Sequence, residues 1–294
     1  MARERRAACW ILALAGVVAA IALARPAVSR GYSNLAMVAV YRHAHAVAAG
    51  AASGGDLARA DALVMRALAL DADNRAARRG RGFLLWEQGA REEAGLEWRR
   101  GGIPVNDFLR AAWQAQEAGS PSLAMEWYRR AMAAWPDVGD PYVGAAGLYE
   151  RDKDWETALA LYERALAVDS FYSSWMERRA HHGRGDILRQ LGRLEEALAE
   201  YEWIVAHAPD YYWGYTHLAE LAWEVQGNAQ RAERLYQQAI ALDASIKWAY
   251  RGLATLYEQT GRLQDAEAAY RKVLELDPND EVARSGLERL AGRP

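Results

Sequence analysis

The chain of 294 residues has a single cysteine, Cys9, and this absence excludes two kinds of site. One cysteine cannot form a disulfide within the chain, nor a zinc site built from several thiolates. The residues before it, MARERRAA, lack the hydrophobic stretch that precedes a lipid-modified cysteine, so a lipoprotein site is excluded as well. We interpret Cys9 as a small apolar residue.

Proline and lysine are also scarce, with 8 prolines and only three lysines among 36 basic residues. Few prolines and abundant alanine favour helix. We interpret the excess of arginine as a coding bias rather than as selection for guanidinium chemistry. Because the formal net charge is −3, no overall positive field attracts nucleic acid, which we do not expect as a partner.

Motifs of the common enzyme classes are missing. The sequence contains no GxSxG, HExxH, GxxxxGK[ST] or GxGxxG pattern. Closely spaced histidines, as in His43/His45 and His181/His182, point in diverging directions on a helix and make poor pairs of metal ligands. We therefore expect a non-catalytic protein that binds neither a metal nor a cofactor.

Residues 7–24, AACWILALAGVVAAIALA, form the longest uncharged stretch and follow the basic segment MARERR at residues 1–6. As a helix this stretch spans about 27 Å, close to the bilayer core of about 30 Å. Two interpretations stay open. We favour an uncleaved transmembrane anchor over residues 1–25, because a signal peptide usually has a shorter apolar core. The alternative is a signal peptide cleaved near Ala24.

The charges around this stretch favour one membrane orientation without excluding the other. Three arginines precede it, and Arg25, Arg30 and Arg42 follow it. We expect a single-pass membrane protein whose following domain is extracytoplasmic, and the inverted orientation stays open. Residues 26–40 are expected to be a linker.

From residue 41 onward the sequence repeats itself. An alanine recurs seven times, with an aromatic or apolar residue four positions later and, in six of the seven copies, a glycine five positions earlier. The spacings between successive alanines run from 30 to 39 residues, and the alanines are Ala60, Ala94, Ala124, Ala158, Ala197, Ala232 and Ala266.

Residues 249–278, AYRGLATLYEQTGRLQDAEAAYRKVLELDP, are the clearest copy. Tyr250, Leu253 and Tyr257 lie on one stripe of a first helix, which the glycine at 261 ends. Ala266 begins the stripe of a second helix, which a proline stops. This pattern resembles the tetratricopeptide repeat.

The resemblance implies an all-α fold, a right-handed α-solenoid (superhelix) of about seven helix pairs, preceded by an N-terminal hydrophobic helix. The second repeat is short by four residues, and an insert, SSWME at 173–177, lengthens the helix that enters the fifth repeat. Within a solenoid at 41–280, the expected repeats are 41–74, 75–104, 105–138, 139–172, 178–211, 212–246 and 247–280, and a capping helix and tail follow at 281–294.

In the family that the chain resembles, the first helix of each pair lines a concave groove. Carried onto this sequence, the groove positions that we expect to bind a partner are Arg79, Phe83, Trp86, Asn106, Trp113, Glu117, Arg179, His182, Arg189, Trp213, Glu220, Trp223, Trp248 and Arg251. The resemblance implies a non-catalytic scaffold, tethered to the membrane, that binds a peptide or a partner protein there. The five groove tryptophans leave one alternative, a carbohydrate-binding or envelope-polysaccharide assembly accessory protein. The oligomeric state stays open.

The stretch HHGRGD at 181–186 has a near copy, RRGRGF at 78–83. The repeat register places both inside first helices, which excludes a phosphate loop or an exposed adhesion motif. Arg81 and Arg184 then stand where the last repeat has Leu253. We expect both arginines to reach a carboxylate or solvent, at two points of altered superhelix pitch.

Overall fold

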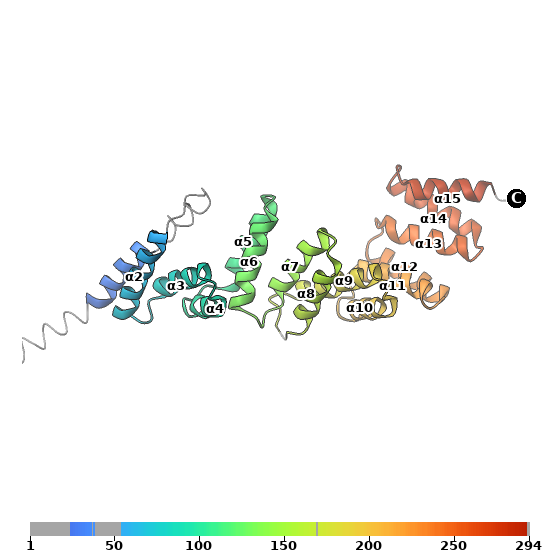
Figure 1. The fold of residues 1–294 in the computed structure, drawn as a ribbon. Helices are drawn as coiled ribbons and strands as arrows, with labels where there is room; N and C mark the ends of the chain where they lie inside the picture. Colours follow the sequence, from blue (N-terminus) through green and yellow to red (C-terminus); the bar gives the residue numbers. More distant parts are fainter. Residues whose placement is uncertain (1–23, 37, 39–53, 169, 293–294) are drawn as a thin grey trace, which may run out of the picture. The chain divides into compact units, whose positions relative to one another are not determined.

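The computed structural model describes residues 24–36, 38, 54–168 and 170–292 (Figure 1). Within these ranges the regular structure is helical and contains no strand, apart from one isolated bridge between Val138 and Ser170. After helical residues 24–36 come α2 (Gly54–Leu70), α3 (Arg75–Glu87), α4 (Arg91–Arg100), α5 (Val105–Glu117), α6 (Pro121–Ala134), α7 (Asp140–Arg151), α8 (Trp155–Leu166), α9 (Ser174–Gln190), α10 (Leu194–His207), α11 (Tyr212–Glu224), α12 (Ala229–Leu242), α13 (Lys247–Gln259), α14 (Leu263–Leu276) and α15 (Glu281–Ala291).

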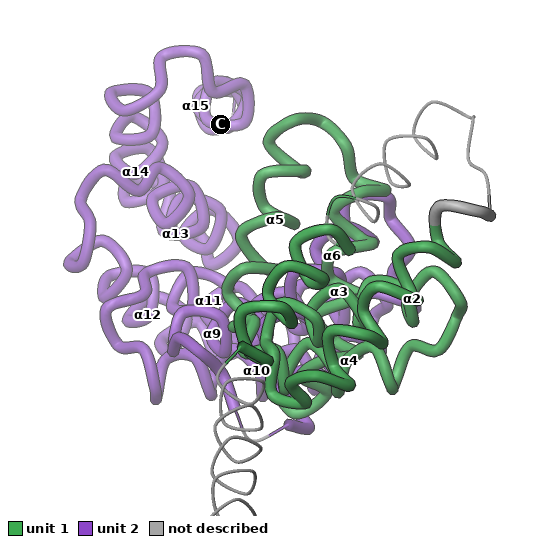
Figure 2. The backbone as a smooth tube through the Cα atoms, turned by 90° about the vertical axis from the view of Figure 1, so that its left-hand side faces the viewer, with its two compact units in different colours: residues 1–137 green, residues 138–294 purple. Residues whose placement is uncertain are grey.

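The chain divides into two compact units, residues 1–137 and 138–294, which we call the N-terminal and C-terminal units (Figure 2). In each, consecutive helices pack as antiparallel pairs, and each pair of the C-terminal unit packs on the next. The helix α15 packs on α14 and ends the stack as the expected cap. The predicted all-α solenoid of helix pairs is therefore confirmed.

The turn between the two helices of a pair uses the predicted glycine. The backbone angle φ is positive at Gly89, Gly119, Gly192, Gly227 and Gly261, with values from +61° to +84°. This left-handed conformation ends the first helix, and glycine adopts it without steric cost. Lys153, the one non-glycine among these slots that the structure describes, adopts the same conformation with φ +61°.

In the C-terminal unit, tyrosines four positions after the repeat alanine connect their own pair to the helix that follows. Tyr162 and Tyr270 are fully buried on the second helix of their pairs, and Tyr236 nearly so. The ring of each lies against a glycine on the first helix that follows, where a Cβ atom would overlap it. The hydroxyls of Tyr162 and Tyr270 reach the first helix of their own pair. The Tyr162 hydroxyl donates to Glu150 (2.7 Å) and the Tyr270 hydroxyl donates to Glu258 (2.9 Å).

The predicted length anomalies are present. The second helix α4 has 10 residues, whereas the second helices from α6 onward have 12 to 14. The first helix α9 has 17, whereas the other first helices from α3 onward have 12 or 13. The short α4 packs on α6, and Gly95 makes this approach possible, because a Cβ atom there would fall on the backbone of Ala133. The stacking therefore departs from the regular pattern directly after the second repeat.

The segment expected to be a linker, 26–40, is helical over residues 26–36 and packs on α2. Three small residues on one face, Ser29, Ser33 and Ala36, are almost fully buried. The Ser29 hydroxyl donates to the carbonyl of Ala67 (2.8 Å) and accepts from the Asn74 side chain (2.7 Å). Their spacing of four and three residues is that of a helix face, so the linker prediction was wrong for this stretch.

Two other expectations fall on residues that the structure does not describe. The apolar stretch 7–24 lies outside the described ranges except for its last residue, and so does most of the first helix of the repeat at 41–74. Of the helices that are described, none combines the length and the apolar character needed to cross a bilayer.

Both GRG copies lie inside helices, α3 and α9, as predicted. Each carries a buried carboxylate on the facing second helix that the sequence did not reveal, Glu97 and Glu200, 5% and 8% exposed. Glu200 accepts from Arg184 (2.8 Å) and lies 2.7 Å from His181 Nδ1. We call these two clusters the polar joints.

The N-terminal polar joint has the same plan. Glu97 accepts from Arg78 at 3.2 Å and lies 3.9 Å from the guanidinium of Arg81. The expectation that Arg81 and Arg184 reach a carboxylate is therefore confirmed. In both joints the second glycine of GRG makes room for a large ring, Trp98 in one and Tyr201 in the other.

Removing one partner of a polar joint is expected to destabilise the fold, whereas replacing the whole joint is not. E200Q removes the buried anion that the partly buried Arg184 and His181 share, leaving Arg184 only Glu163 at 3.9 Å, and should lower the free energy of unfolding by about 2 kcal/mol. The triple variant H181Y/R184L/E200A installs the residues of the last repeat and should remain within about 1 kcal/mol of wild type. Urea unfolding followed by circular dichroism measures both, and equal losses would contradict this account.

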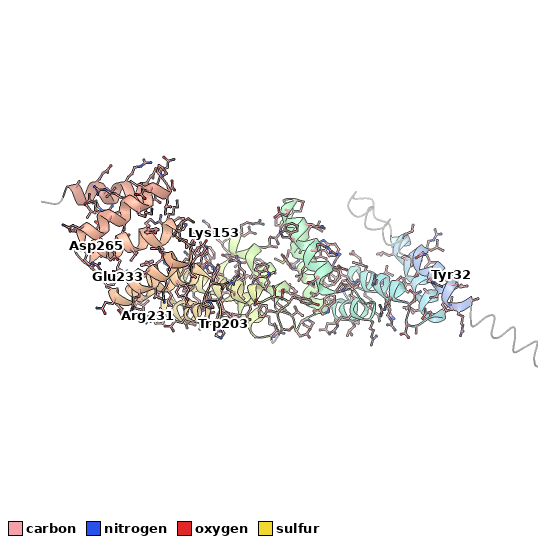
Figure 3. The ribbon with its side chains drawn as sticks, turned by 180° about the vertical axis from the view of Figure 1, so that it is seen from behind. Tyr32, Lys153, Trp203, Arg231, Glu233 and Asp265 are labelled. Carbon is pink, nitrogen blue, oxygen red and sulfur yellow. The ribbon has the colours of Figure 1, made fainter. Side chains whose placement is uncertain are left out.

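Lys153 in Figure 3 offers a test of the turn. A left-handed conformation costs a non-glycine residue about 1–2 kcal/mol. Glycine avoids this cost, but the unfolded chain gains backbone entropy that offsets about 0.5–1 kcal/mol of the benefit. K153G should therefore raise the free energy of unfolding by roughly 0.5–1 kcal/mol. The matched control is G192A, at the equivalent turn, which should lower it. A K153G variant that unfolds more easily than wild type would show that the strain is absent.

Candidate functional site

The first helices of the C-terminal unit, α7, α9 and α11, are linked along one face by polar side chains. Arg179 on α9 donates to Glu150 on α7 (3.1 Å), and Arg189 on α9 donates to Glu220 on α11 (2.5 Å). Burial opposes ionisation of Glu220, but His217 and Arg189 together hold the pKa of this carboxyl below its ordinary value. The face therefore carries fixed charges of both signs.

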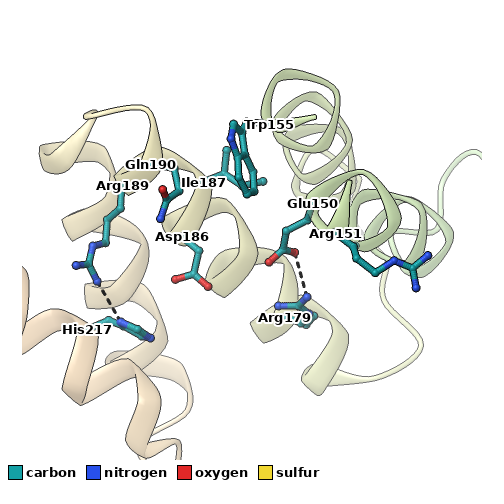
Figure 4. Close-up of a pocket in the computed structure, with 10 residues that line it drawn as sticks. Glu150, Arg151, Trp155, Arg179, Asp186, Ile187, Arg189, Gln190 and His217 are labelled. Atoms are coloured by element: carbon teal, nitrogen blue, oxygen red, sulfur yellow. Dashed lines mark hydrogen bonds and ion pairs between the residues drawn. The ribbon is translucent and has the colours of Figure 1, made fainter. Parts of the chain in front are cut away.

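A cavity of about 530 Å³ opens on this face between α7, α9 and α11 (Figure 4). It is bounded by the Arg179–Glu150 ion pair, by Arg189 and by the indole of Trp155. Its lining consists of Gly147, Glu150, Arg151, Trp155, Arg179, Asp186, Ile187, Arg189, Gln190 and His217.

A second cavity, of about 390 Å³, adjoins the first at Arg189. Its rim carries two indoles, and the Trp223 Nε1 donates to Gln259 on α13 (2.5 Å). The Arg251 guanidinium lies 4.0 Å from the centre of the Trp248 ring, a cation–π contact. The lining consists of Arg189, Glu220, Trp223, Glu224, Tyr236, Trp248, Arg251, Gly252, Thr255, Leu256, Gln259 and Val282.

The two cavities bring together most of the groove residues predicted in this unit. Those that line a cavity are Arg179, Arg189, Glu220, Trp223, Trp248 and Arg251. Two others lie beside the cavities. Trp213 packs on His217 and Trp248, and the His182 ring lies 5.2 Å from that of His217.

None of the candidates of the N-terminal unit lines either of these two cavities. Arg79 donates to the carbonyls of Gly101 and Gly102, at the end of α4. Trp86 is only 8% exposed, packs on Trp98 in the core and donates to Glu126 (2.5 Å), so the expectation that it is a groove platform was wrong.

The remaining candidates of this unit are either partly buried or exposed. Phe83 is partly buried against the Trp98 ring. Asn106, Trp113 and Glu117 are exposed on α5, and Trp113 is 58% exposed.

His217 lines the first cavity although it was not among the predicted groove positions. Its ring stacks between Tyr201, at 5.1 Å, and Trp213, at 5.6 Å. Its Nδ1 lies 3.3 Å from an Arg189 nitrogen and 3.5 Å from Glu220. The residue stands two positions after the aromatic slot of its repeat, where the resemblance assigned no groove position.

The adjacent histidines diverge as predicted. His181 stacks on Trp203, with ring centres 3.6 Å apart, and belongs to the polar joint. His182 turns toward Asp186 and His217, and no hydrogen bond reaches either of its buried ring nitrogens. Burial lowers the pKa of His182 to about 4, although Asp186 opposes this shift. One ligand atom from each of His182, Asp186 and His217 lies within 4.8 Å of the other two, close enough to hold a metal ion.

Comparison with known proteins identifies the repeats. Family models described as tetratricopeptide repeat match residues 137–210 and 226–290. The solved structure of Pseudomonas aeruginosa PilF is similar, with 14% identity and a TM-score of 0.52 over 90% of this chain and 99% of that one. MamA from Desulfovibrio magneticus RS-1 shares 19% identity and a TM-score of 0.51 over 60% of this chain and 97% of that one. The similarity of the chain to these two structures is one of fold alone. No curated protein sequence matches the chain.

The low pKa of His182 predicts a pH dependence. A histidine whose folded pKa of about 4 lies below its ordinary 6.5 stays neutral at pH 7. Between pH 6.5 and 4 this histidine is protonated in the unfolded chain but neutral in the folded protein. The free energy of unfolding therefore declines as the pH falls through this range, by about 3 kcal/mol in all. Histidine NMR resonances followed from neutral to acidic pH, with H182Q for assignment, should show a midpoint near 4. A midpoint above 6 would contradict the burial argument.

Proposed function

Since the chain is a tetratricopeptide-repeat protein, we propose that it is a non-catalytic interaction scaffold whose C-terminal unit binds an extended segment of a partner protein along α7, α9, α11 and α13. The observation that carries this proposal is the pair of adjoining cavities that share Arg189. An extended chain advances about 3.3–3.6 Å per residue, so a segment of several residues reaches from one cavity to the next.

The chemistry of the two cavities defines the segment. The first cavity is lined by three arginines and two carboxylates and so fits charged side chains of both signs; these residues are Arg151, Arg179, Arg189, Glu150 and Asp186. The second cavity is rimmed by Trp223 and Trp248, whose indoles fit apolar or cationic side chains. A partner segment with acidic and basic residues next to an aromatic or aliphatic one satisfies both cavities.

Several of these side chains are held in place before a partner arrives. Arg179 and Arg189 are fixed by ion pairs to the neighbouring first helix, and Glu150 also accepts from the buried Tyr162. Fixed side chains lose less conformational entropy on binding than free ones, which favours affinity. This support from within the core favours the C-terminal unit over the N-terminal unit as the binding surface.

The same rim leaves a second candidate function, the binding of an envelope glycan. Sugar rings stack on indoles, and Trp223 and Trp248 line one cavity. The paired charges of the first cavity favour a peptide over a neutral sugar. Titrating tryptophan fluorescence with soluble envelope oligosaccharides distinguishes the two candidates, because a peptide-binding scaffold gives no response.

We also propose that residues 7–24 tether the scaffold to a membrane, with the repeats on the extracytoplasmic side. The uncharged stretch and the basic residues before it support this arrangement. A tether of this kind would keep the repeats near the membrane surface, so that the partner would be a membrane or envelope protein.

Affinity capture from washed membranes tests the scaffold function. The full chain, cross-linked before extraction, should retain a specific protein partner. Purified partner should then bind W223A/W248A at least about tenfold more weakly than wild type, because buried tryptophans dominate such interfaces. W175A is the matched control, since Trp175 is 53% exposed and lines neither cavity.

Other outcomes of these binding experiments would contradict parts of the proposal. Equal binding by wild type and W223A/W248A would remove the second cavity from the interface. A loss of binding in W175A alone would place the partner on another face. Recovery of the chain in the soluble fraction would contradict the tether but leave the scaffold function standing.

A further inference from the structure

Three metal-ligating side chains converge beside the first cavity without any assigned role. His182 and Asp186 are four residues apart on α9 and therefore share a helix face, and His217 reaches them from α11. Other charged and titratable groups around them are Arg179, Arg189, Glu150, Glu220 and the hydroxyls of Tyr201 and Tyr211. The two arginines are already paired with the two glutamates, so Asp186 is not neutralised by an arginine partner of its own.

One ligand distance and the spacing of the two imidazoles match a tetrahedral site, and the three ligand atoms all lie within 4.8 Å of one another. His182 Nδ1 lies 3.3 Å from Asp186 Oδ2. Ligands about 2.0–2.1 Å from one tetrahedral ion lie about 3.3 Å apart, and two imidazoles on such an ion have ring centres about 5 Å apart. The rings of His182 and His217 are 5.2 Å apart and inclined at 64°.

The hydrogen bonding around the cluster is incomplete, and an ion beside Asp186 would satisfy one of the two ring nitrogens of His182. Both buried ring nitrogens of His182 lack a hydrogen-bond partner, which is uncommon for buried polar groups. Asp186 accepts the Tyr201 hydroxyl through Oδ1 (2.6 Å), so its Oδ2 remains on the side of His182. The tyrosine thereby orients the carboxylate.

His217 has the outer partner that a ligating histidine usually has. If Nε2 binds the ion, Nδ1 carries the proton and can donate to Glu220, whose Oε2 is 3.5 Å away. Carboxylates in this outer position orient the ring and raise its basicity. Arg189 approaches the same Nδ1 at 3.3 Å, so ion binding selects the tautomer that leaves Arg189 to Glu220 alone.

We propose that His182, Asp186 and His217 form a binding site for a divalent transition-metal ion, with zinc as the ion that best fits two imidazoles and one carboxylate. Asp186 and His217 also line the first cavity, so a fourth coordination position faces it and is open to water or to a donor from a bound partner. This departs from the expectation, drawn from the sequence alone, that the protein binds no metal. The site stands independently of the proposed peptide binding.

Titration with cobalt(II) tests the site directly. The full chain in mild detergent, without a histidine tag and stripped with a chelator, should bind one Co²⁺ with the intense visible absorption of a tetrahedral complex. Zinc chloride should then bleach this absorption. H182Q and H217Q should each weaken binding by more than about tenfold, whereas H207Q, the same change at a histidine outside the cluster, should not.

A further variant covers the case in which the histidine variants do not fold. D186N keeps an oxygen that can accept from Tyr201 but removes the anionic ligand, and circular dichroism verifies its fold. Absence of the tetrahedral absorption, or equal Co²⁺ affinity in wild type and D186N, would overturn the site. Binding that survives in a folded H182Q/H217Q variant would place the ion elsewhere and overturn it as well.

Discussion

The C-terminal unit depends on the packing of the buried tyrosine that each second helix carries. The ring of Tyr162 fills the space between α8 and the α9 glycine, while its hydroxyl holds Glu150 on α7. One side chain therefore closes its own repeat, attaches the next and positions a groove carboxylate from behind. Because the core and the polar face share this residue, the geometry of the face is as rigid as the core beneath it.

The elements of this fold were predictable because their signals are local. The glycine five residues before each repeat alanine predicted the turns, and the long α9 followed from the SSWME insert. The lysine at 153 did not disturb the pattern, because the packing of α7 on α8 imposes the left-handed turn in spite of its cost. The period also placed Arg179 and Arg189 on the face where the cavities lie.

What the sequence did not reveal depends on contacts between helices. In the sequence Glu97 and Glu200 resemble ordinary surface acids, because the arginines that pair with them lie on a different helix. Trp86 is buried because the short α4 brings α6 close enough to cover it. His217 joins the first cavity through its contacts with Tyr201 on α10 and Arg189 on α9, which no single-helix pattern encodes.

The polar joints have a consequence for how the helices find their partners. Similar repeats are prone to mispairing, since one second helix can dock on the wrong first helix of its own or another chain. At the position of Glu97 and Glu200 the other described repeats carry apolar residues: Leu63, Trp127, Leu161, Leu235 and Ala269. A mispaired α10 would bury Glu200 against an apolar face without its cations, at a cost of several kcal/mol. The two joints thus disfavour the docking of α4 or α10 on the apolar first helices of the other repeats, whereas each glutamate would still find cations at the other joint.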